Sequence, residues 1–142
     1  AWNYKVGNDF DAKFAALCPA GIDVYFDNVG GAITDAAIRH LSPGARICLC
    51  GQISQYNLEV PESGPRWLEQ LIVTQARVQG FLVSAFLERF PEGWAQLTQW
   101  LHAGNLKYRE DVAHGIEAAP QAFIGMLQGK NEGKQLVQLS EL

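Results

Sequence analysis

Residues 22–31 have the sequence IDVYFDNVGG, an apolar run followed by two polar residues and then, after one valine, two glycines. The apolar part, Ile22 to Phe26, is rich in β-branched and aromatic residues and predicts a short buried strand. Gly30-Gly31 then open a helix predicted from Ala32 to Leu41, which Ser42-Pro43-Gly44 ends. A strand that passes through a polar turn into a helix is the repeating unit of an α/β protein.

The neighbouring segments continue this alternation. An apolar stripe at helical spacing predicts a helix from Asp9 to Leu17, and the run from Arg46 to Cys50 predicts the next strand. Pro65 suits the first turn of a helix that continues through Ile72, after which Val78 to Val83 predicts a third buried strand. The order strand, helix, strand, helix, strand predicts a parallel sheet covered by helices on both faces.

The C-terminal part adds a helix after Pro91 that ends at Gly104-Asn105. Three shorter elements are predicted beyond it: a strand at Leu106 to Arg109, a helix from about Pro120 to Leu127, and a strand at Gln135 to Leu139. The predicted fold class is therefore α/β, a partial doubly wound, Rossmann-like parallel sheet with flanking helices and a C-terminal helix-strand coda.

Composition excludes several classes of function. The 142 residues are 48% hydrophobic, 11% aromatic and only 18% charged, which is typical of a folded domain. A net charge of −4 without a lysine-rich run argues against a nucleic-acid partner. The longest nearly apolar run, Phe81 to Leu87, is too short to span a bilayer, and no basic and apolar leader opens the sequence. We therefore expect no nucleic acid and no membrane as partners.

The cysteines and histidines do not form a recognisable site. Cys18, Cys48 and Cys50 contain no C-x-x-C pair, which argues against a disulfide framework and favours the reducing cytoplasm. The three histidines do not complete a zinc-ligand spacing with them. We therefore predict no metal site.

Two polar segments follow predicted strands. In a doubly wound sheet, ligands bind beyond the carboxyl ends of the strands, where Asp27 and Asn28 would lie. The loop Cys50 to Asn57 follows the next strand and carries many hydrogen-bonding side chains, and Gly51 would let a flat ligand approach the backbone. An Asx turn before a helix and an ordinary polar loop are the alternative interpretations.

These two segments carry a family resemblance, together with Asn3-Tyr4-Lys5 and FIGMLQGKNEGK at residues 123–134. They resemble the zinc-independent medium-chain dehydrogenases/reductases. The most similar subgroup is the NADPH-dependent alkenal and enone reductases, of the leukotriene B4 dehydrogenase, prostaglandin reductase and curcumin reductase type. The motif YFDNVGG, residues 25–31, is specific for that subgroup, and the resemblance covers essentially the whole chain.

The resemblance implies an oxidoreductase that uses NADP to reduce the carbon-carbon double bond of a small α,β-unsaturated aldehyde or ketone. Tyr56 would be the catalytic residue, because its neutral phenol, with an ordinary pKa of about 10, donates a hydrogen bond or proton to the substrate carbonyl. The implied cofactor contacts begin with Tyr4 near the adenosine phosphate and Asn28 beside the cofactor at the strand tip. On the nicotinamide side they are Cys50, Gly51, Gln52, Ile53, Ser54, Gln55, Tyr56, Phe81, Leu82 and Val83, and Asn131 closes on the nicotinamide from the C-terminal loop.

The sequence contains no G-x-G-x-x-G turn for the cofactor phosphates. It opens on Ala1 without a Met, so we expect a fragment whose Gly-rich half lies upstream and which is inactive in isolation. Residues 1–104 would then be the C-terminal part of a dinucleotide-binding domain. Residues 105–142 would be a coda that packs on an N-terminal substrate domain.

The last predicted strand, Val78 to Val83, would leave an apolar edge that invites pairing with another chain, and the resemblance implies a two-fold contact there, so we expect a homodimer. Two other interpretations remain open. One is a non-catalytic, truncated α/β module that acts through oligomerisation, and the other is an unrelated α/β domain that binds a small ligand.

Overall fold

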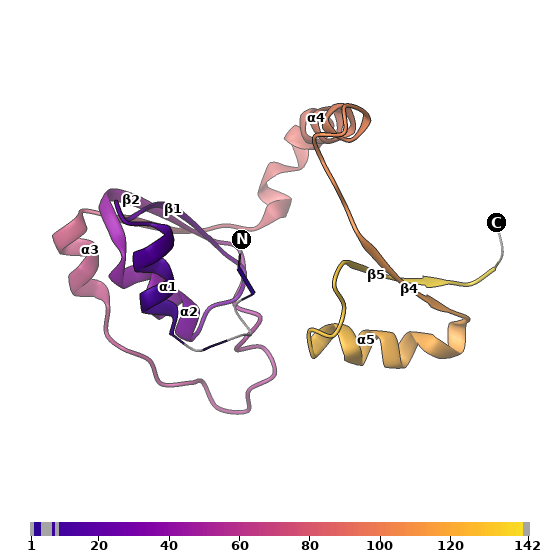
Figure 1. Ribbon diagram of the computed structural model, residues 1–142, viewed down its shortest axis with the longest axis horizontal. Coiled ribbons are helices and arrows are strands. Elements are labelled where there is room, and N and C mark those ends of the chain that lie inside the picture. The colour runs from indigo at the N-terminus through magenta and orange to yellow at the C-terminus, as the bar shows by residue number, and fades with distance from the viewer. Residues whose placement is uncertain (1, 4–6, 8, 141–142) are drawn as a thin grey trace. The chain divides into compact units, whose positions relative to one another are not determined.

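The computed structural model describes residues 2–3, 7 and 9–140. They form two compact units, Ala1–Leu87 and Glu88–Leu142, each of which is described by itself (Figure 1). The first unit holds a three-stranded parallel sheet with the order β1-β2-β3, and the second holds the parallel pair β4-β5. The prediction of an α/β fold with parallel strands is confirmed.

The first unit alternates helices and strands. Its elements are α1 (Phe10–Leu17), β1 (Ile22–Asp27), α2 (Ala32–Arg39), β2 (Leu41–Leu49), α3 (Leu68–Thr74) and β3 (Arg77–Gly80). Asp9 begins α1 because its carboxylate accepts a hydrogen bond of 2.9 Å from the Ala12 backbone N–H. Gln75, in the left-handed conformation with φ 54°, ends α3.

The helices of this unit pack on one face of its sheet. Tyr25, Ile47 and Val78 are aligned across the three strands and belong to the core or pack against it. The opposite face carries Val24 and Phe26, whose surfaces are 53% and 57% exposed. The prediction of helices on both faces is therefore wrong for this unit, because both crossovers between its paired strands lie on the same side.

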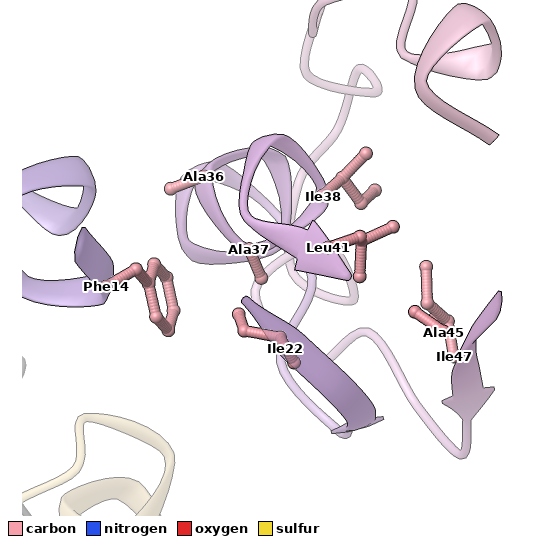
Figure 2. Close-up of a cluster of buried hydrophobic side chains, with 8 residues drawn as sticks. All are labelled: Phe14, Ile22, Ala36, Ala37, Ile38, Leu41, Ala45 and Ile47. Carbon is pink, nitrogen blue, oxygen red and sulfur yellow. The ribbon is translucent and has the colours of Figure 1, made fainter. Parts of the chain in front are cut away.

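The core joins α1 and α2 to the sheet. Figure 2 shows Ala37 of α2 and Ile22 of β1 pointing toward one another, with Phe14 of α1 beside them. Leu41 and Ile47 extend this cluster along β2. Small alanines on α2 allow that helix to approach the strands closely, which explains why α2 is the most buried helix of the unit.

Several predicted boundaries in this unit are wrong. The helix predicted to reach Leu41 ends at Arg39, and residues 42–44 lie inside β2, where the register with β1 shifts between Ile22 and Val24. The third helix begins at Leu68 and not near Pro65. The third strand ends at Gly80 and is mostly exposed, so the expected buried strand Val78 to Val83 is shorter than predicted.

A 3₁₀ segment, η1 (Val83–Arg89), leads into the second unit, which contains α4 (Phe90–His102), β4 (Glu110–His114), η2 (Ile116–Ala118), α5 (Ala119–Leu127) and β5 (Lys134–Gln138). The helices after Pro91 and near Pro120 and the last strand are confirmed. The strand predicted at Leu106 to Arg109 is wrong, because pairing with β5 begins at Glu110.

In Figure 1, α5 lies alongside the β4-β5 pair that it connects. The division into functional domains after residue 104 stays a prediction, since the compact units describe packing and not function. Within the described part of the chain, no helix combines the length and apolar character needed to cross a membrane.

A charged cluster at the start of α1 predicts a pH dependence. The Arg39 guanidinium donates hydrogen bonds of 3.0 and 2.7 Å to Asp11 and holds the pKa of that carboxyl below its ordinary value, with a smaller effect from His40. A lowered pKa stabilises the fold above the unfolded-state value of about 4, and this stabilisation is lost as the pH falls through the folded-state value. We expect Asp11→Asn to be less stable than the wild type at neutral pH and to approach it in strong acid.

Urea midpoints measured from pH 7 down to pH 2 test this expectation. Arg39→Gln removes the guanidinium, so it should remove the same acid-dependent change in urea midpoint that Asp11→Asn removes. If the urea midpoints of wild type and Asp11→Asn differ by the same amount at every pH, the lowered pKa of Asp11 does not contribute to stability.

Candidate functional site

The carboxyl ends of the first sheet meet at one edge. Asp27, Leu49 and Gly80 are the last residues of β1, β2 and β3, and they are aligned in register. The segments that follow these strands therefore leave the sheet side by side. This is the edge at which open parallel sheets bind ligands.

A groove of about 670 Å³ lies between the ends of β2 and β3. Its lining combines apolar side chains with a few polar groups, which is typical of a small-molecule site. The residues that line it are Leu49, Cys50, Gly51, Gln52, Tyr56, Gly80, Phe81, Leu82 and Ala85. Phe81 also contacts the rings of Phe26 and Phe86, with centroids 5.8 and 5.7 Å away, which fixes one apolar wall.

Tyr56 lies over Gly51 in this groove. The Tyr56 hydroxyl accepts a hydrogen bond of 3.0 Å from the Gln52 backbone N–H, which leaves the hydroxyl hydrogen to donate. A Cβ at Gly51 would lie 3.0 Å from this hydroxyl oxygen and 3.5 Å from the Asn28 carbonyl oxygen. Glycine at position 51 therefore makes room for the phenol, which is 67% exposed.

A buried carboxylate organises the turn after β1. Asp27 is 1% exposed, and its Oδ1 accepts hydrogen bonds of 2.8 and 3.0 Å from the Val29 and Gly30 backbone N–H groups. The Asx turn before the helix, one of the two interpretations of this segment, is therefore present. Asp27 Oδ2 accepts a hydrogen bond of 2.7 Å from the Thr34 hydroxyl in α2.

Tyr25 extends this network on the core side. Its hydroxyl lies 3.2 Å from Thr34 Oγ1, and burial raises the pKa of Tyr25 above its ordinary value. The phenol therefore keeps its proton and donates to Thr34, whose own hydrogen goes to Asp27. All three side chains are satisfied by one another.

Backbone hydrogen bonds join the turn after β1 to the loop that carries Tyr56. The Asp27 carbonyl accepts from Cys50 and Gly51 at 2.8 and 3.1 Å, and the carbonyls of Asn28 and Val29 accept from Ile53 and Ser54 at 3.1 and 3.0 Å. Gly30, with φ 70°, also lies against Gln52, because a Cβ there would be 3.2 Å from Gln52 Cβ. The two loops are therefore tied together along their length.

A second depression of about 540 Å³ borders the same loop on the side of α2. Its lining includes Gln52, Gln55, Asp35 and Glu62, and Gln55 donates a hydrogen bond of 3.0 Å to Glu62. Partial burial raises the pKa of Asp35, and the neighbouring Glu62 carboxylate raises it further, while Arg39 opposes both.

The structure brings six of the predicted site residues together along the groove: Cys50, Gly51, Gln52, Tyr56, Phe81 and Leu82. Asn28 is exposed at the tip of β1, beside Gly51. Ile53, Ser54 and Gln55 form the turn between Gln52 and Tyr56 and do not line this groove, nor does Val83, which begins η1. Tyr4 lies outside the described residues.

Asn131 belongs to the second unit. Its side-chain amide donates a hydrogen bond of 2.6 Å to the Gly133 carbonyl, and the adjacent Glu132 N–H donates to Asp111 at 2.7 Å. The loop that follows α5 is thus held against β4. A contact between Asn131 and a cofactor stays a prediction.

Sequence reasoning missed four residues of this region. Leu49 and Gly80 line the groove because they end paired strands, whereas the sequence places those strand ends at Cys50 and Val83. Ala85 lies in the 3₁₀ segment and has no recognisable sequence signal. Thr34 looks like an ordinary helix residue, and only its distance to Asp27 in space identifies it.

A model of the family described as zinc-binding dehydrogenase matches residues 2–137. The chain belongs to the zinc-binding dehydrogenase family. The predicted membership of the medium-chain dehydrogenases/reductases is thereby confirmed. Among the residues that the structure describes, no group of three or more His, Cys, Asp or Glu is placed to hold a metal ion.

The chain is 44% identical over 140 residues to the NADP(+)-dependent 2-alkenal reductase of Nicotiana tabacum, which covers 99% of the chain and 40% of that protein. It is 39% identical over 138 residues to the NADPH-dependent curcumin reductase of Escherichia coli, over 94% of the chain and 40% of that protein. The crystal structure of CurA from Vibrio vulnificus in complex with NADPH superimposes with a TM-score of 0.87 and 44% identity, over 96% of the chain and 42% of CurA.

These relatives are reductases of the alkenal and curcumin type, the subgroup that the sequence motifs of the chain resemble. The chain spans about two fifths of the length of each of these relatives. The activity of a complete protein that contains it is therefore a proposal.

Proposed function

We propose that this chain forms the nicotinamide and substrate side of an NADP-dependent reductase that acts on the carbon-carbon double bond of α,β-unsaturated aldehydes or ketones. The observation that carries the proposal is the groove at the sheet edge, in which the Tyr56 hydroxyl is oriented with its hydrogen available. Similarity to a 2-alkenal reductase and to a curcumin reductase supports the substrate class.

The groove suits the nicotinamide end of the cofactor. Apolar walls from Leu49, Phe81 and Leu82 fit the faces of a flat ring, and Gly51 leaves the backbone accessible beside them. The described residues offer no Gly-rich turn for the phosphates. The residues present therefore fit one end of NADP, and the phosphates would be held by another part of a complete enzyme.

Several residues outside the groove are proposed as further contacts. Asn28 would face the cofactor from the tip of β1, and Ile53, Ser54, Gln55 and Val83 would border it from the adjoining loops. Tyr4 would lie near the adenosine phosphate, and Asn131 would close on the nicotinamide from the loop after α5. The proposed cofactor contacts inside the groove include Cys50, Gln52 and Phe81.

The chain's own residues position the substrate and stabilise charge. When bound, the dinucleotide supplies the hydride for the reduction. When hydride reaches the β-carbon of the substrate, negative charge develops on its carbonyl oxygen, and a proton from solvent then adds to the α-carbon to complete the reduction. Tyr56 donates a hydrogen bond from its hydroxyl to that oxygen and keeps its proton, while its own oxygen is held by the Gln52 N–H. Leu82 and Ala85 would form the apolar side of the groove beside the reacting carbons.

A chimera tests the proposal. This chain replaces the matching 42% of Vibrio vulnificus CurA, and NADPH consumption is followed by absorbance with a 2-alkenal as substrate. We expect turnover that depends on both NADPH and the alkenal. The 142-residue chain alone, as a control, should bind NADPH weakly and show no turnover. The proposal would be contradicted if a folded chimera oxidised no NADPH with alkenals. Micromolar NADPH affinity of the chain alone would contradict the proposal that another part of the enzyme holds the phosphates.

The same proposal includes a homodimer. β3 lies at an edge of its sheet, and exposed strand edges pair readily with another chain. Leu82, 73% exposed just after this strand, would lie at the contact. We expect the chain to sediment as a dimer at micromolar concentration and Leu82→Lys to sediment as a monomer. An unchanged mass of the variant, or a monomeric wild type, would exclude this contact.

A further inference from the structure

The hydroxyl of Tyr56 is held by a loop whose position depends on residues outside the groove. Gln52 donates to the Tyr56 hydroxyl, but the segment around Gln52 contains no helix or strand of its own. Its backbone is fixed by hydrogen bonds to the carbonyls of Asp27, Asn28 and Val29. The placement of the phenol therefore depends on how firmly the turn after β1 is held.

That turn is held by one buried carboxylate. Asp27 accepts the N–H groups of Val29 and Gly30 through one oxygen and the Thr34 hydroxyl through the other. Hydrogen bonds to a buried carboxylate are short and strong, so they fix the turn more tightly than neutral contacts would. Thr34 in turn anchors the carboxylate to α2, the most buried helix of the unit.

Neither Asp27 nor Thr34 is among the residues that line the groove. Asp27 is 1% exposed, and Thr34 is also buried. Their hydrogen-bonding groups are used by each other, by the turn and by Tyr25. They are therefore placed to act through the loop and not by touching substrate.

We propose that Asp27 and Thr34 are positioning residues that set the location of the Tyr56 hydroxyl, through the turn after β1 and the loop from Cys50 to Tyr56. This inference rests on the proposed function for its kinetic consequence. Its structural consequence, the order of the Gly51 and Gln52 backbone, can be tested without any reaction. Small misplacements of a group that acts in the transition state lower the rate strongly, even when binding is unaffected.

Thr34→Val is the most informative variant, because valine keeps the shape of threonine and replaces its hydroxyl with a methyl group. Thr74→Val makes the same chemical change in α3, where the hydroxyl donates to the Gln70 carbonyl at 2.6 Å and has no connection to the Asp27 network. Thr34→Ser restores a hydroxyl and should restore the wild-type behaviour. The three variants separate the loss of this hydrogen bond from the loss of a hydroxyl in a helix.

The first measurement is amide hydrogen exchange on the 142-residue chain. The Ile22 N–H, which donates to the His40 carbonyl at 2.8 Å and belongs to a core residue of the same unit, reports general loss of stability. Relative to Ile22, we expect Thr34→Val to accelerate exchange of Gly51 and Gln52 about tenfold. Thr74→Val and Thr34→Ser should leave this ratio as in the wild type. An unchanged ratio in Thr34→Val would overturn the inference.

The second measurement is kinetic and uses the CurA chimera. Thr34→Val should lower kcat about tenfold, with the KM for NADPH changed less than about twofold. In the Tyr56→Phe background the same substitution should have no further effect, because both act on one hydroxyl. A loss of kcat by the same factor in both backgrounds would overturn the inference. An inactive chimera would contradict the proposed function, and the exchange measurement would then decide the inference by itself.

Discussion

Tyr56→Phe in the CurA chimera should lower kcat on a 2-alkenal about a hundredfold. The substitution keeps the ring beside Gly51 and removes the donor that we propose for the substrate carbonyl oxygen. Charge on that oxygen is largest in the transition state, so the loss appears in kcat and less in KM. NADPH affinity, measured by fluorescence titration, should change less than about threefold, because the groove walls are unaltered.

Tyr108→Phe provides the matched control. Tyr108 is 70% exposed in the segment before β4, so removal of its hydroxyl should leave kcat at the wild-type value. Equal kcat values for Tyr56→Phe and wild type would show that Tyr56 has no catalytic role and belongs to an ordinary polar loop. A large rise in the dissociation constant of NADPH with unchanged kcat would place the phenol on the cofactor and not on the substrate.

Asp27→Ala should reduce the free energy of unfolding of the first unit by about 3 kcal/mol. The substitution removes the acceptor of the buried Gly30 N–H and Thr34 hydroxyl and of the partly buried Val29 N–H. Each unsatisfied buried donor costs about 1 kcal/mol or more. Urea unfolding with an unchanged denaturant slope measures the loss as a shift of the midpoint.

Asp23→Ala is the corresponding change on the same strand. The exposed Asp23 accepts a hydrogen bond of 2.6 Å from the Ser42 hydroxyl, which also lies 3.2 Å from the Ile22 carbonyl and can donate there instead. Its loss should therefore cost less than about 1 kcal/mol. Asp27→Asn keeps an acceptor for the turn and should fall between the two alanine variants. Equal costs for Asp23→Ala and Asp27→Ala would show that the buried network contributes little.

The sequence predicted those elements whose signal is local. The apolar run at Ile22 to Phe26 and the glycines behind it located β1 and the start of α2, and prolines located α4 and α5. The position of the site could also be predicted from local sequence. Polar residues that directly follow neighbouring parallel strands lie at the same edge of the sheet. The grouping of Cys50, Gly51, Gln52 and Tyr56 with Phe81 and Leu82 in one groove agrees with that expectation.

The missed features depend on tertiary contacts. Ser42-Pro43-Gly44 has the composition of a turn, yet it lies within β2 because the strand bulges opposite β1. The end of β3 was placed too late, because Phe81 and Leu82 continue its apolar pattern but leave the strand to line the groove. The sheet face that carries Val24 and Phe26 is exposed although its residues are apolar. An apolar residue pattern alone does not show whether a helix packs on that face.

The strand order of the first sheet has a consequence for synthesis on the ribosome. Because β1, β2 and β3 pair in the order in which they occur in the chain, each new strand joins the edge left by the preceding one. None of these three strands has to insert between two that are already paired. The sheet can therefore grow vectorially as the chain emerges, and the acceptors of the turn after β1 are in place before the loop that carries Tyr56 leaves the exit tunnel.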